Sequence, residues 1–166
     1  KMQDSNNSIY ILDFEDSFTH NISEVLMSLG LSSSVVDQEC FFEKMDLNCR
    51  SPFLFSKNNK YGVILGPGPG HPSKYFKKID LINKLMSYKN VFVMGICLGH
   101  QLIWYGKGEK ISERSYPIHG KVFSFKPPSW DIFRPLLNEN LNLHVQQYNS
   151  LCLKKSTMKS LNGNSQ

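Results

Sequence analysis

The sequence has few cysteines and no long apolar run. No segment approaches the roughly 18 apolar residues that cross a bilayer, and the N-terminal stretch has no apolar core of signal-peptide length. Four cysteines occur in 166 residues, and no two form a Cys-x-x-Cys pair, which argues against a disulfide framework and a zinc site: Cys40, Cys49, Cys97 and Cys152. We therefore expect a soluble, cytoplasmic protein with no metal or other cofactor and no membrane partner.

The sequence also lacks a block of basic residues. The net charge is +5 and the pI is near 9.0, but the lysines are scattered, as in "KNNK" and "SKYFKK". This pattern is typical of a solvated surface rather than of a nucleic-acid footprint, so we expect no nucleic-acid partner. At this length one domain with a substantial core is the expectation, spanning residues 1–166.

Apolar segments of strand length alternate with segments of helical spacing in the first two thirds of the chain. Near-continuous apolar strands separated by amphipathic helices predict a parallel sheet covered on both faces. The predicted fold class is α/β: an open, doubly wound, mostly parallel, flavodoxin-like sheet, with added antiparallel strands after residue 107. The expected strands are 8–14, 32–38, 61–66 and 90–96, and the expected helices are a segment ending at Gly30, 74–87 and 98–106.

Other segments carry weaker signals. Asp16 and Ser17 offer cap oxygens for the first helix, and its apolar residues form one stripe. The stretch 40–60 contains Pro52 and a polar run, which predicts an irregular connection. Residues 121–128 and 141–151 alternate in polarity as strands do, and a Pro-rich turn and a short stretch at 133–137 join them.

The segment Gly66-Pro67-Gly68-Pro69-Gly70 follows the third predicted strand. Proline fixes φ and lacks an N–H, whereas glycine tolerates positive φ, so this loop is stiff and can aim a few backbone N–H groups. Ligands of open parallel sheets bind at this edge, where strands lead into helices. The segment lacks the Lys-Ser/Thr ending of a P-loop and the dinucleotide fingerprint. An ordinary rigid turn is the alternative interpretation.

The segment Gly95-Ile96-Cys97-Leu98-Gly99 follows the fourth predicted strand and resembles a cysteine form of the nucleophile elbow. Flanking glycines fit a turn so sharp that side chains would collide with the neighbouring strand and helix. At a helix N-terminus, Cys97 would experience the positive end of the dipole, which favours the thiolate. The N–H of Leu98 would point at an oxygen of the group under attack. A buried structural cysteine is the alternative interpretation.

These residues resemble those of class I glutamine amidotransferases, specifically the small glutaminase component of anthranilate synthase or 4-amino-4-deoxychorismate synthase. The matching segments follow the order of the family from residue 8 to 151. The "DSFTHN" and "HGK" segments point to the chorismate-linked branch, which serves tryptophan or folate biosynthesis. The matches are "ILDFEDSFTHNI", "GVILGPGPGHP", "GICLGHQLI", "PIHGKV" and "QYNSL".

The resemblance implies that Cys97 attacks the side-chain amide of L-glutamine, forms a glutamyl thioester and releases ammonia to a large chorismate-binding synthase subunit. It places Gly68 and Leu98 as donors of the oxyanion hole. It makes Asp16, Ser17 and the stretch 119–121 structural or partner-facing. The positions it matches to substrate binding are Gly68, Pro69, Gly70, Gln101, Ser150 and Leu151.

The sequence departs from the family at three places. The family reads Arg-Tyr-His-Ser-Leu where this chain has Gln147 to Leu151, and Ser where it has Gly66. The catalytic His and Glu of the family lie in a His-Pro-Glu motif, and the 166 residues contain no such motif. Either the sequence is a piece of a longer protein, which we favour because its polar last residues are a natural place for order to fail, or it is a shortened, silent relative.

Other histidines are weak substitutes for the missing base. We expect all five to be surface or satisfied structural residues, with His71 the least implausible substitute because its loop ends near the sulfur: His20, His71, His100, His119 and His144. Two alternative functions remain at this stage. One is a catalytically silent binding or regulatory module, and the weaker one is a γ-glutamyl hydrolase built on the same elbow.

Overall fold

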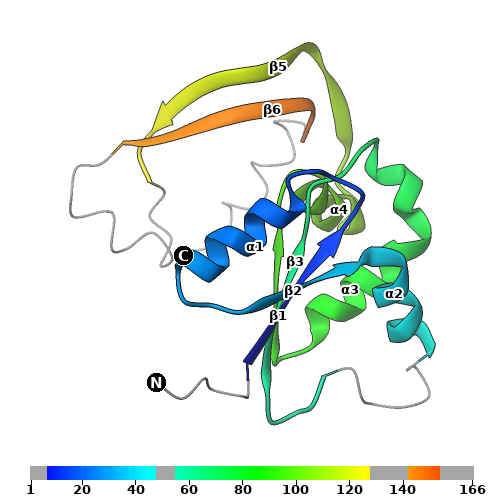
Figure 1. Cartoon of the computed structure of the whole chain (residues 1–166). Coiled ribbons are helices and arrows are strands. Elements are labelled where there is room, and N and C mark those ends of the chain that lie inside the picture. The colour runs from blue at the N-terminus through cyan, green and yellow to red at the C-terminus, as the bar shows by residue number, and fades with distance from the viewer. Residues whose placement is uncertain (1–6, 48–54, 128–141, 154–166) are drawn as a thin grey trace, which may run out of the picture. The chain divides into compact units, whose positions relative to one another are not determined.

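The computed structural model describes residues 7–47, 55–127 and 142–153. The chain divides into two compact units (Figure 1). The first contains the described residues up to Ile111 together with Leu153, and the second is Ser112–Cys152. Each unit is described by itself below. Within the described residues, no helix is long and apolar enough to cross a membrane.

The first unit is built on a four-stranded parallel sheet, as the sequence predicts. The strand order is β2-β1-β3-β4, and each neighbouring pair is parallel. Ile11 at the centre pairs with Val35 on one side and Ile64 on the other. The four strands agree with the expected segments to within two residues: β1 (Asn7–Asp13), β2 (Ser33–Asp37), β3 (Lys60–Leu65) and β4 (Val91–Gly95).

Helices cover both faces of this sheet, which confirms the doubly wound arrangement. Helix α1 (Thr19–Ser28) packs on β1 and β2, whereas α2 (Gln38–Leu47), α3 (Ile79–Ser87) and α4 (Leu98–Gly106) pack on the opposite face (Figure 1). Each βα connection returns the chain to a parallel strand. The carboxyl ends of all four strands therefore lie at one edge of the sheet.

The hydrophobic core lies between the sheet and the α2–α3–α4 layer. Leu12, Val63 and Leu65 on this face are fully buried, as are Leu85 and Leu102 on the helices. Val91 and Val93 of β4 pack against the same core. Because side chains alternate along a strand, Phe92 and Met94 point to the other face, where 66% and 48% of their surface is exposed.

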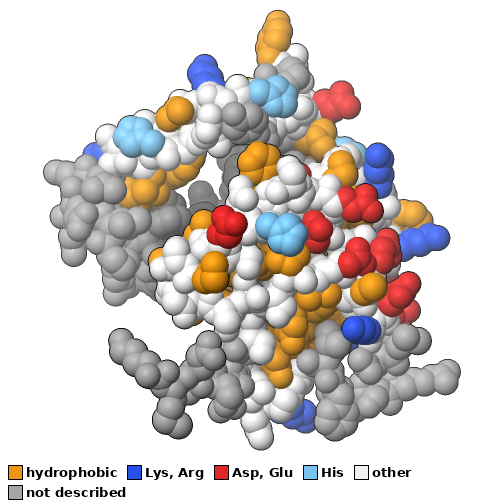
Figure 2. Space-filling model, in the orientation of Figure 1, with side chains coloured by type: hydrophobic (Ala, Val, Ile, Leu, Met, Phe, Trp, Pro, Cys, Tyr) orange, Lys and Arg blue, Asp and Glu red, His pale blue; other side chains and the backbone are white. Residues whose placement is uncertain are grey.

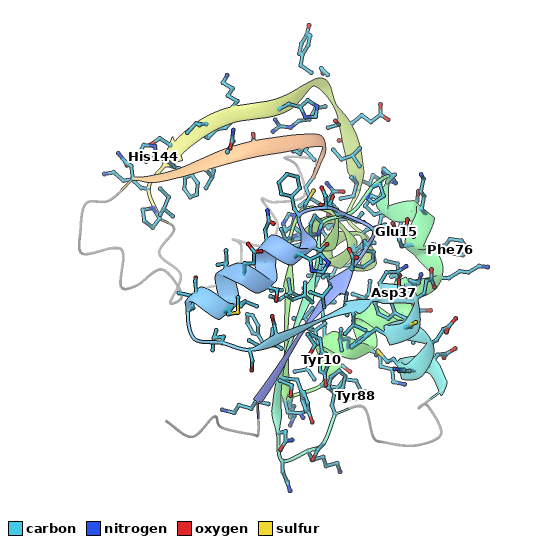
Figure 3. All side chains as sticks on the ribbon, viewed as in Figure 1. Tyr10, Glu15, Asp37, Phe76, Tyr88 and His144 are labelled. Carbon is cyan, nitrogen blue, oxygen red and sulfur yellow. The ribbon has the colours of Figure 1, made fainter. Side chains whose placement is uncertain are left out.

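The prediction of an irregular connection at 40–60 is wrong for its first part, because α2 occupies Gln38–Leu47. Asp37 ends β2 and its carboxylate accepts a hydrogen bond from the N–H of Cys40 at 2.9 Å, as a helix cap does (Figure 3 labels Asp37). Phe41, Phe42 and Met45 then pack into the core. Helical spacing of these apolar residues outweighs the polar composition of the segment. Residues 48–54 lie outside the described part.

The expected continuous helix at 74–87 is also corrected. A 3-10 helix, η2 (Pro72–Lys78), precedes α3, and it is kinked at Tyr75, where φ is −103° and ψ is 18°. The apolar spacing is the same on both sides of the kink, so the pattern alone does not reveal the change of helix type. Helix α4 has the predicted bounds, 98–106.

Helix α1 begins at Thr19, and its cap residue Phe18 makes no side-chain cap hydrogen bond. The Asp16 carboxylate instead accepts from the N–H of Phe18 at 2.9 Å, so one of the two predicted cap oxygens acts just before the helix. Gly30 ends the helix at φ 76°, as predicted. The apolar stripe is largely exposed: Phe18, Val25 and Leu29 each expose more than half of their surface.

The second unit is a two-stranded antiparallel sheet of β5 (Ile111–Phe125) and β6 (Leu143–Leu153). It confirms the strands predicted after residue 107, although β5 begins ten residues before the expected segment 121–128. The Gln146 amide donates to the carbonyl of Gly120 across the pair at 3.4 Å. The expected Pro-rich turn beyond residue 127 and the stretch 133–137 lie outside the described residues.

Candidate active site

Three loops meet at the carboxyl edge of the parallel sheet, following β1, β3 and β4. Gly68 is the point of contact. A Cβ atom on Gly68 would lie 2.5 Å from Cβ of Phe14 in the first loop and 2.7 Å from Cδ2 of Leu98, beside the elbow. These approaches are closer than real Cβ contacts allow. The backbone of the Gly-Pro loop is therefore wedged between the β1 loop and the start of α4.

The elbow has the strained geometry that its sequence predicts. Cys97 has φ 53° and ψ −109°, a backbone conformation that residues with a side chain rarely adopt, and α4 begins at the next residue. A Cβ atom on Gly95 would lie 2.5 Å from the backbone carbon of Gly99. Hydrogen bonds fix the turn against the third strand and its loop: Ile96 N to Leu65 O at 2.9 Å, and Gly99 N to Gly66 O at 3.2 Å.

The Cys97 residue is exposed, and its thiol is free. Surrounding protein atoms nevertheless desolvate the thiolate and raise the pKa of Cys97 above its ordinary value. The backbone N–H of Leu98 opposes this rise in pKa, and the negative charge of Asp16 adds to it. The N–H of Leu98 favours the thiolate, as expected at a helix N-terminus, but desolvation outweighs this contribution and the pKa of Cys97 is raised overall.

The loop after β1 is held by its own carboxylates. Asp13 accepts hydrogen bonds from the Thr19 hydroxyl at 2.8 Å and from the backbone N–H of Asp16 at 3.3 Å. Thr19 is fully buried. Glu15, between the two aspartates, has a positive φ of 63° (Figure 3 labels it at the carboxyl end of the sheet). The loop therefore has a defined conformation at the rim of the site.

The Gly-Pro loop is anchored at both ends. Gly66 donates to the carbonyl of Leu12 at 3.1 Å. A Cβ atom there would lie 2.6 Å from that oxygen, so the serine usual in the family would clash in this chain. Gly70 has φ 84°, and the Tyr75 hydroxyl donates a long 3.5 Å hydrogen bond to the carbonyl of Pro69. Burial, and then the charge of Glu15, raises the pKa of Tyr75.

The remaining predicted substrate residues occupy both units. Gln101 lies on the first turn of α4, 9% exposed, and its N–H donates to the carbonyl of Cys97 at 3.1 Å. The structure thus brings together the predicted residues of the first unit: Cys97, Leu98, Gln101, Gly68, Pro69 and Gly70. Ser150 and Leu151 lie on β6 in the second unit, and their substrate contacts stay predictions.

Neither His71 nor His100 is arranged as a base for Cys97. The Nδ1 atom of His71 accepts from the N–H of Ser73 at 3.2 Å and caps η2. The Nε2 atom of His100 accepts from the Trp104 indole at 2.9 Å, and burial lowers the pKa of His100. The hydrogen bonds of these two imidazoles therefore go to Ser73 and Trp104 and not to the thiol. Both histidines have structural roles, in agreement with the sequence interpretation.

Sequence reasoning missed two side chains at this edge. Asp13 organises the first loop through its hydrogen bonds. The sequence pattern that could have revealed it is an acidic residue at the end of a strand, followed by Thr19 at the start of a helix. Lys74 of η2 lies over the Gly-Pro loop: a Cβ atom on Gly70 would be 3.0 Å from its Nζ atom. Spacing alone could not reveal this approach. No cluster of three or more His, Cys, Asp or Glu residues suited to a metal occurs in the described part.

The family is decided by comparison with known proteins. The family model "Glutamine amidotransferase class-I" matches residues 10–162. The chain belongs to the class I glutamine amidotransferases. Anthranilate synthase component 2 of Pyropia yezoensis is 30% identical over 145 residues, which cover 87% of this chain and 69% of the relative. Anthranilate synthase component 2 of Archaeoglobus fulgidus is 32% identical, and the match covers 87% of this chain and 68% of that relative.

A solved structure supports the fold assignment of this class I amidotransferase. A glutamine amidotransferase from Thermotoga maritima superposes with a TM-score of 0.58 at 16% identity. The match covers 90% of this chain and 63% of that protein. At this identity the likeness shows the fold alone, and it agrees with the α/β architecture predicted from the sequence.

Proposed function

We propose that this amidotransferase hydrolyses L-glutamine through Cys97. The observation that carries the proposal is the elbow itself: an exposed thiol on a strained backbone, beside the wedged Gly68 and the first N–H groups of α4. Backbone strain at one residue is retained when the surrounding structure enforces it, and it is concentrated at functional sites. The alternative interpretation of Cys97, a buried structural cysteine, does not agree with its exposure.

The proposed chemistry follows from this arrangement. The Cys97 sulfur bonds to the amide carbon of glutamine, and the C–N bond breaks to release ammonia once the nitrogen has gained a proton. The N–H groups of Leu98 and Gly68 stabilise the oxyanion that forms on the way. Water then cleaves the glutamyl thioester and releases glutamate. We assign the transfer of the thiol proton to a base outside the described residues, as the family resemblance implies.

The similar proteins suggest a partner for this chain. The relatives described above are named anthranilate synthase component 2, so we propose that this chain delivers ammonia to a large, chorismate-using synthase subunit. The product branch, tryptophan or folate precursor, is set by that subunit. The thiol mechanism requires a reduced Cys97, which fits a cytoplasmic location.

Glutamine hydrolysis in the presence of the large subunit tests this function. We expect ammonia release that is abolished in Cys97→Ser, while Cys40→Ser, which alters another exposed cysteine, retains it. Removing a nucleophile from a group that acts as a unit costs several orders of magnitude in rate. Ammonia release that persists in Cys97→Ser, or none from the wild-type complex, contradicts the proposal.

The raised pKa of Cys97 favours one second candidate, a non-catalytic binding module with an idle thiol. A glutamine-like electrophile of the acivicin type separates the two functions. Stoichiometric labelling confined to Cys97, and prevented by glutamine, supports the hydrolase. Labelling spread over the exposed cysteines at the rate of a simple thiol supports the module.

A further inference from the structure

Tyr75 of η2 contacts the Gly-Pro loop in a way that the mechanism above does not use. Its hydroxyl donates to the carbonyl of Pro69 at 3.5 Å. Its ring makes a T-shaped contact with the Phe14 ring, with the centroids 5.3 Å apart. Phe14 is fully buried, and its Cβ lies 2.5 Å from the position that a Cβ on Gly68 would occupy. Tyr75 therefore meets the loop directly at Pro69 and, through one intervening ring, at Gly68.

Other contacts hold the Tyr75 ring in place. The ring packs against the hydrophobic core, and the Lys78 ammonium lies 5.8 Å from its centroid, within the range of a cation–π interaction. Lys78 forms an ion pair with Glu39 of α2, and its side chain is only 14% exposed. Figure 2 shows acidic and basic side chains over the part of the molecule that Figure 1 labels α2. These contacts make the ring a fixed support.

The Gly-Pro loop needs such a support because glycine permits wide backbone rotation. Gly70 has a positive φ of 84°, and the peptide that joins it to Pro69 is trans. A peptide unit is planar, so a donor that holds the carbonyl of Pro69 also fixes the direction of the Gly70 N–H. On the other side of Pro69, the backbone of Gly68 is set by its close approach to Phe14. Tyr75 thus acts on both glycines that flank Pro69.

The Tyr75 hydroxyl is suited to a lasting hydrogen bond. Burial raises the pKa of Tyr75, and the negative charges of Glu15 and Glu39 raise it further. A phenol with a raised pKa stays protonated at neutral and mildly alkaline pH. It therefore remains a donor to the carbonyl of Pro69 throughout this range.

We propose that Tyr75 is a positioning residue that braces the Gly-Pro loop, through the Phe14 ring and the Pro69 carbonyl, and so keeps the N–H of Gly68 aimed at the oxyanion. This inference rests on the proposed glutaminase function and adds a residue that acts on the transition state through the loop. An oxyanion donor interacts more strongly with the charged transition state than with the neutral amide. Misplacing such a group by about 1 Å can cost roughly 100-fold in rate, so loss of the brace should lower kcat and change KM little.

Two substitutions of Tyr75 test the brace in the complex with the large synthase subunit. Tyr75→Phe removes the hydroxyl and keeps the ring, whereas Tyr75→Leu removes both. We expect kcat for ammonia release to fall about threefold in Tyr75→Phe and about tenfold or more in Tyr75→Leu. The KM for glutamine should stay within about threefold of the wild-type value in both.

Tyr88 provides the matched control. It is a half-buried tyrosine whose ring packs on Phe55, with the centroids 5.7 Å apart. Figure 3 shows Tyr88 at the end of the sheet opposite to Glu15, away from the Gly-Pro loop. Tyr88→Phe and Tyr88→Leu remove the same groups as the Tyr75 variants and should leave kcat and KM unchanged.

Phe14→Leu tests the route through the ring. It keeps a Cβ beside Gly68 and removes the ring that meets Tyr75. Residues that act through one contact give losses that do not add. The kcat of the double variant, Phe14→Leu with Tyr75→Leu, should therefore lie within about threefold of the worse single variant. Losses that multiply overturn the route through Phe14.

A second measurement detects the order of the loop without catalysis. Nitrogen-15 relaxation in the full chain gives backbone order parameters, which are about 0.85 in rigid backbone and below about 0.6 in flexible backbone. Gly68 and Gly70 should be rigid in the wild type and more flexible in Tyr75→Leu, while Gly62 of β3 stays unchanged. Tyr75→Phe keeps the packing of the ring, and a smaller change in Gly70 of this variant tests the brace if Tyr75→Leu does not fold.

The outcomes separate this inference from the proposed function. Equal kcat in Tyr75→Leu and Tyr88→Leu, or unchanged order of Gly68 and Gly70, overturns the brace and leaves hydrolysis intact. A raised KM with an unchanged kcat also overturns the brace, because Tyr75 would then act on substrate binding. A loop that becomes flexible in Tyr75→Leu, in a protein whose wild type releases no ammonia, supports the brace and contradicts hydrolysis. An unchanged loop in such a protein overturns both.

Discussion

A Cβ atom on Gly99 would lie 2.0 Å from the carbonyl oxygen of Leu65. The backbones of β3 and α4 are therefore in direct contact immediately beside the nucleophile. The same approach brings the first turn of α4 next to the Gly-Pro loop, because Leu65 leads directly into Gly66. Gly99 thus fixes where the thiol lies relative to the loop that is proposed to bind substrate.

The first prediction concerns this contact. Gly99→Ala should destabilise the fold by roughly 3 kcal/mol or more, since neither backbone can move away without breaking the sheet or the helix. Urea unfolding followed by circular dichroism measures the change. Gly62→Ala in β3 is the control: its Cβ would meet Ile9 at an ordinary 3.4 Å, so its effect should lie within about 1 kcal/mol of zero. Equal effects would refute the steric argument.

The elbow and the parallel sheet could be predicted because their signals are local. Gly95 and Gly99 flank a cysteine at the junction of an apolar strand and an apolar helix, and this spacing requires a tight turn wherever it occurs. The parallel direction of the strands also follows from the repeated strand–helix units. In contrast, α2 was missed because Asp37 and the aromatic pair after it lie in a polar stretch whose composition resembles a loop.

The charges around the site could not be predicted from spacing. Lys74, which approaches Gly70, lies on a 3-10 helix with a kink at Tyr75, whereas the periodicity of the segment is equally compatible with an α-helix. The raised pKa of Cys97 is a balance between desolvation and a helix N-terminus. The sequence reveals the helix, but the packing around the sulfur depends on three loops from distant parts of the chain.

The second prediction concerns the Asp13–Thr19 hydrogen bond of 2.8 Å. Thr19→Val keeps the shape of the side chain and removes the hydroxyl, which leaves a carboxylate oxygen of Asp13 short of a donor. The free energy of unfolding should fall by about 1–3 kcal/mol. Thr19→Ser keeps the hydroxyl, so its free energy of unfolding should fall by less. Thermal unfolding of the three proteins measures this order, and a valine variant as stable as wild type would show that the hydrogen bond contributes nothing.

The third prediction concerns the pH dependence of Cys97. Its pKa is raised in the folded chain, mainly by burial, so alkylation by iodoacetamide should reach half its maximal rate at higher pH in the folded chain than in the urea-unfolded chain. The folded state disfavours the thiolate. Stability should therefore decline as pH rises from the ordinary cysteine pKa through the folded value, and this part of the decline should vanish in Cys97→Ala. Coincident alkylation profiles would contradict the raised pKa.

The fourth prediction concerns His100, whose Nε2 accepts the Trp104 indole N–H at 2.9 Å. Burial lowers the pKa of His100, and the hydrogen bond from the indole requires in addition an unprotonated Nε2. Trp104→Phe removes the donor and should raise this pKa towards its ordinary value. Titration of the His100 ring protons by NMR measures the shift.

The sign of the linked stability effect follows from the lowered pKa. In the wild type, the unfolded chain takes up a proton on His100 at a higher pH than the folded chain does, so stability is lost as pH falls from the ordinary histidine pKa to the folded value. Trp104→Phe should reduce this acid sensitivity. If the variant instead slowed alkylation of Cys97 at neutral pH and left the His100 titration unchanged, His100 would act on the thiol rather than on the indole, and its structural assignment would be wrong.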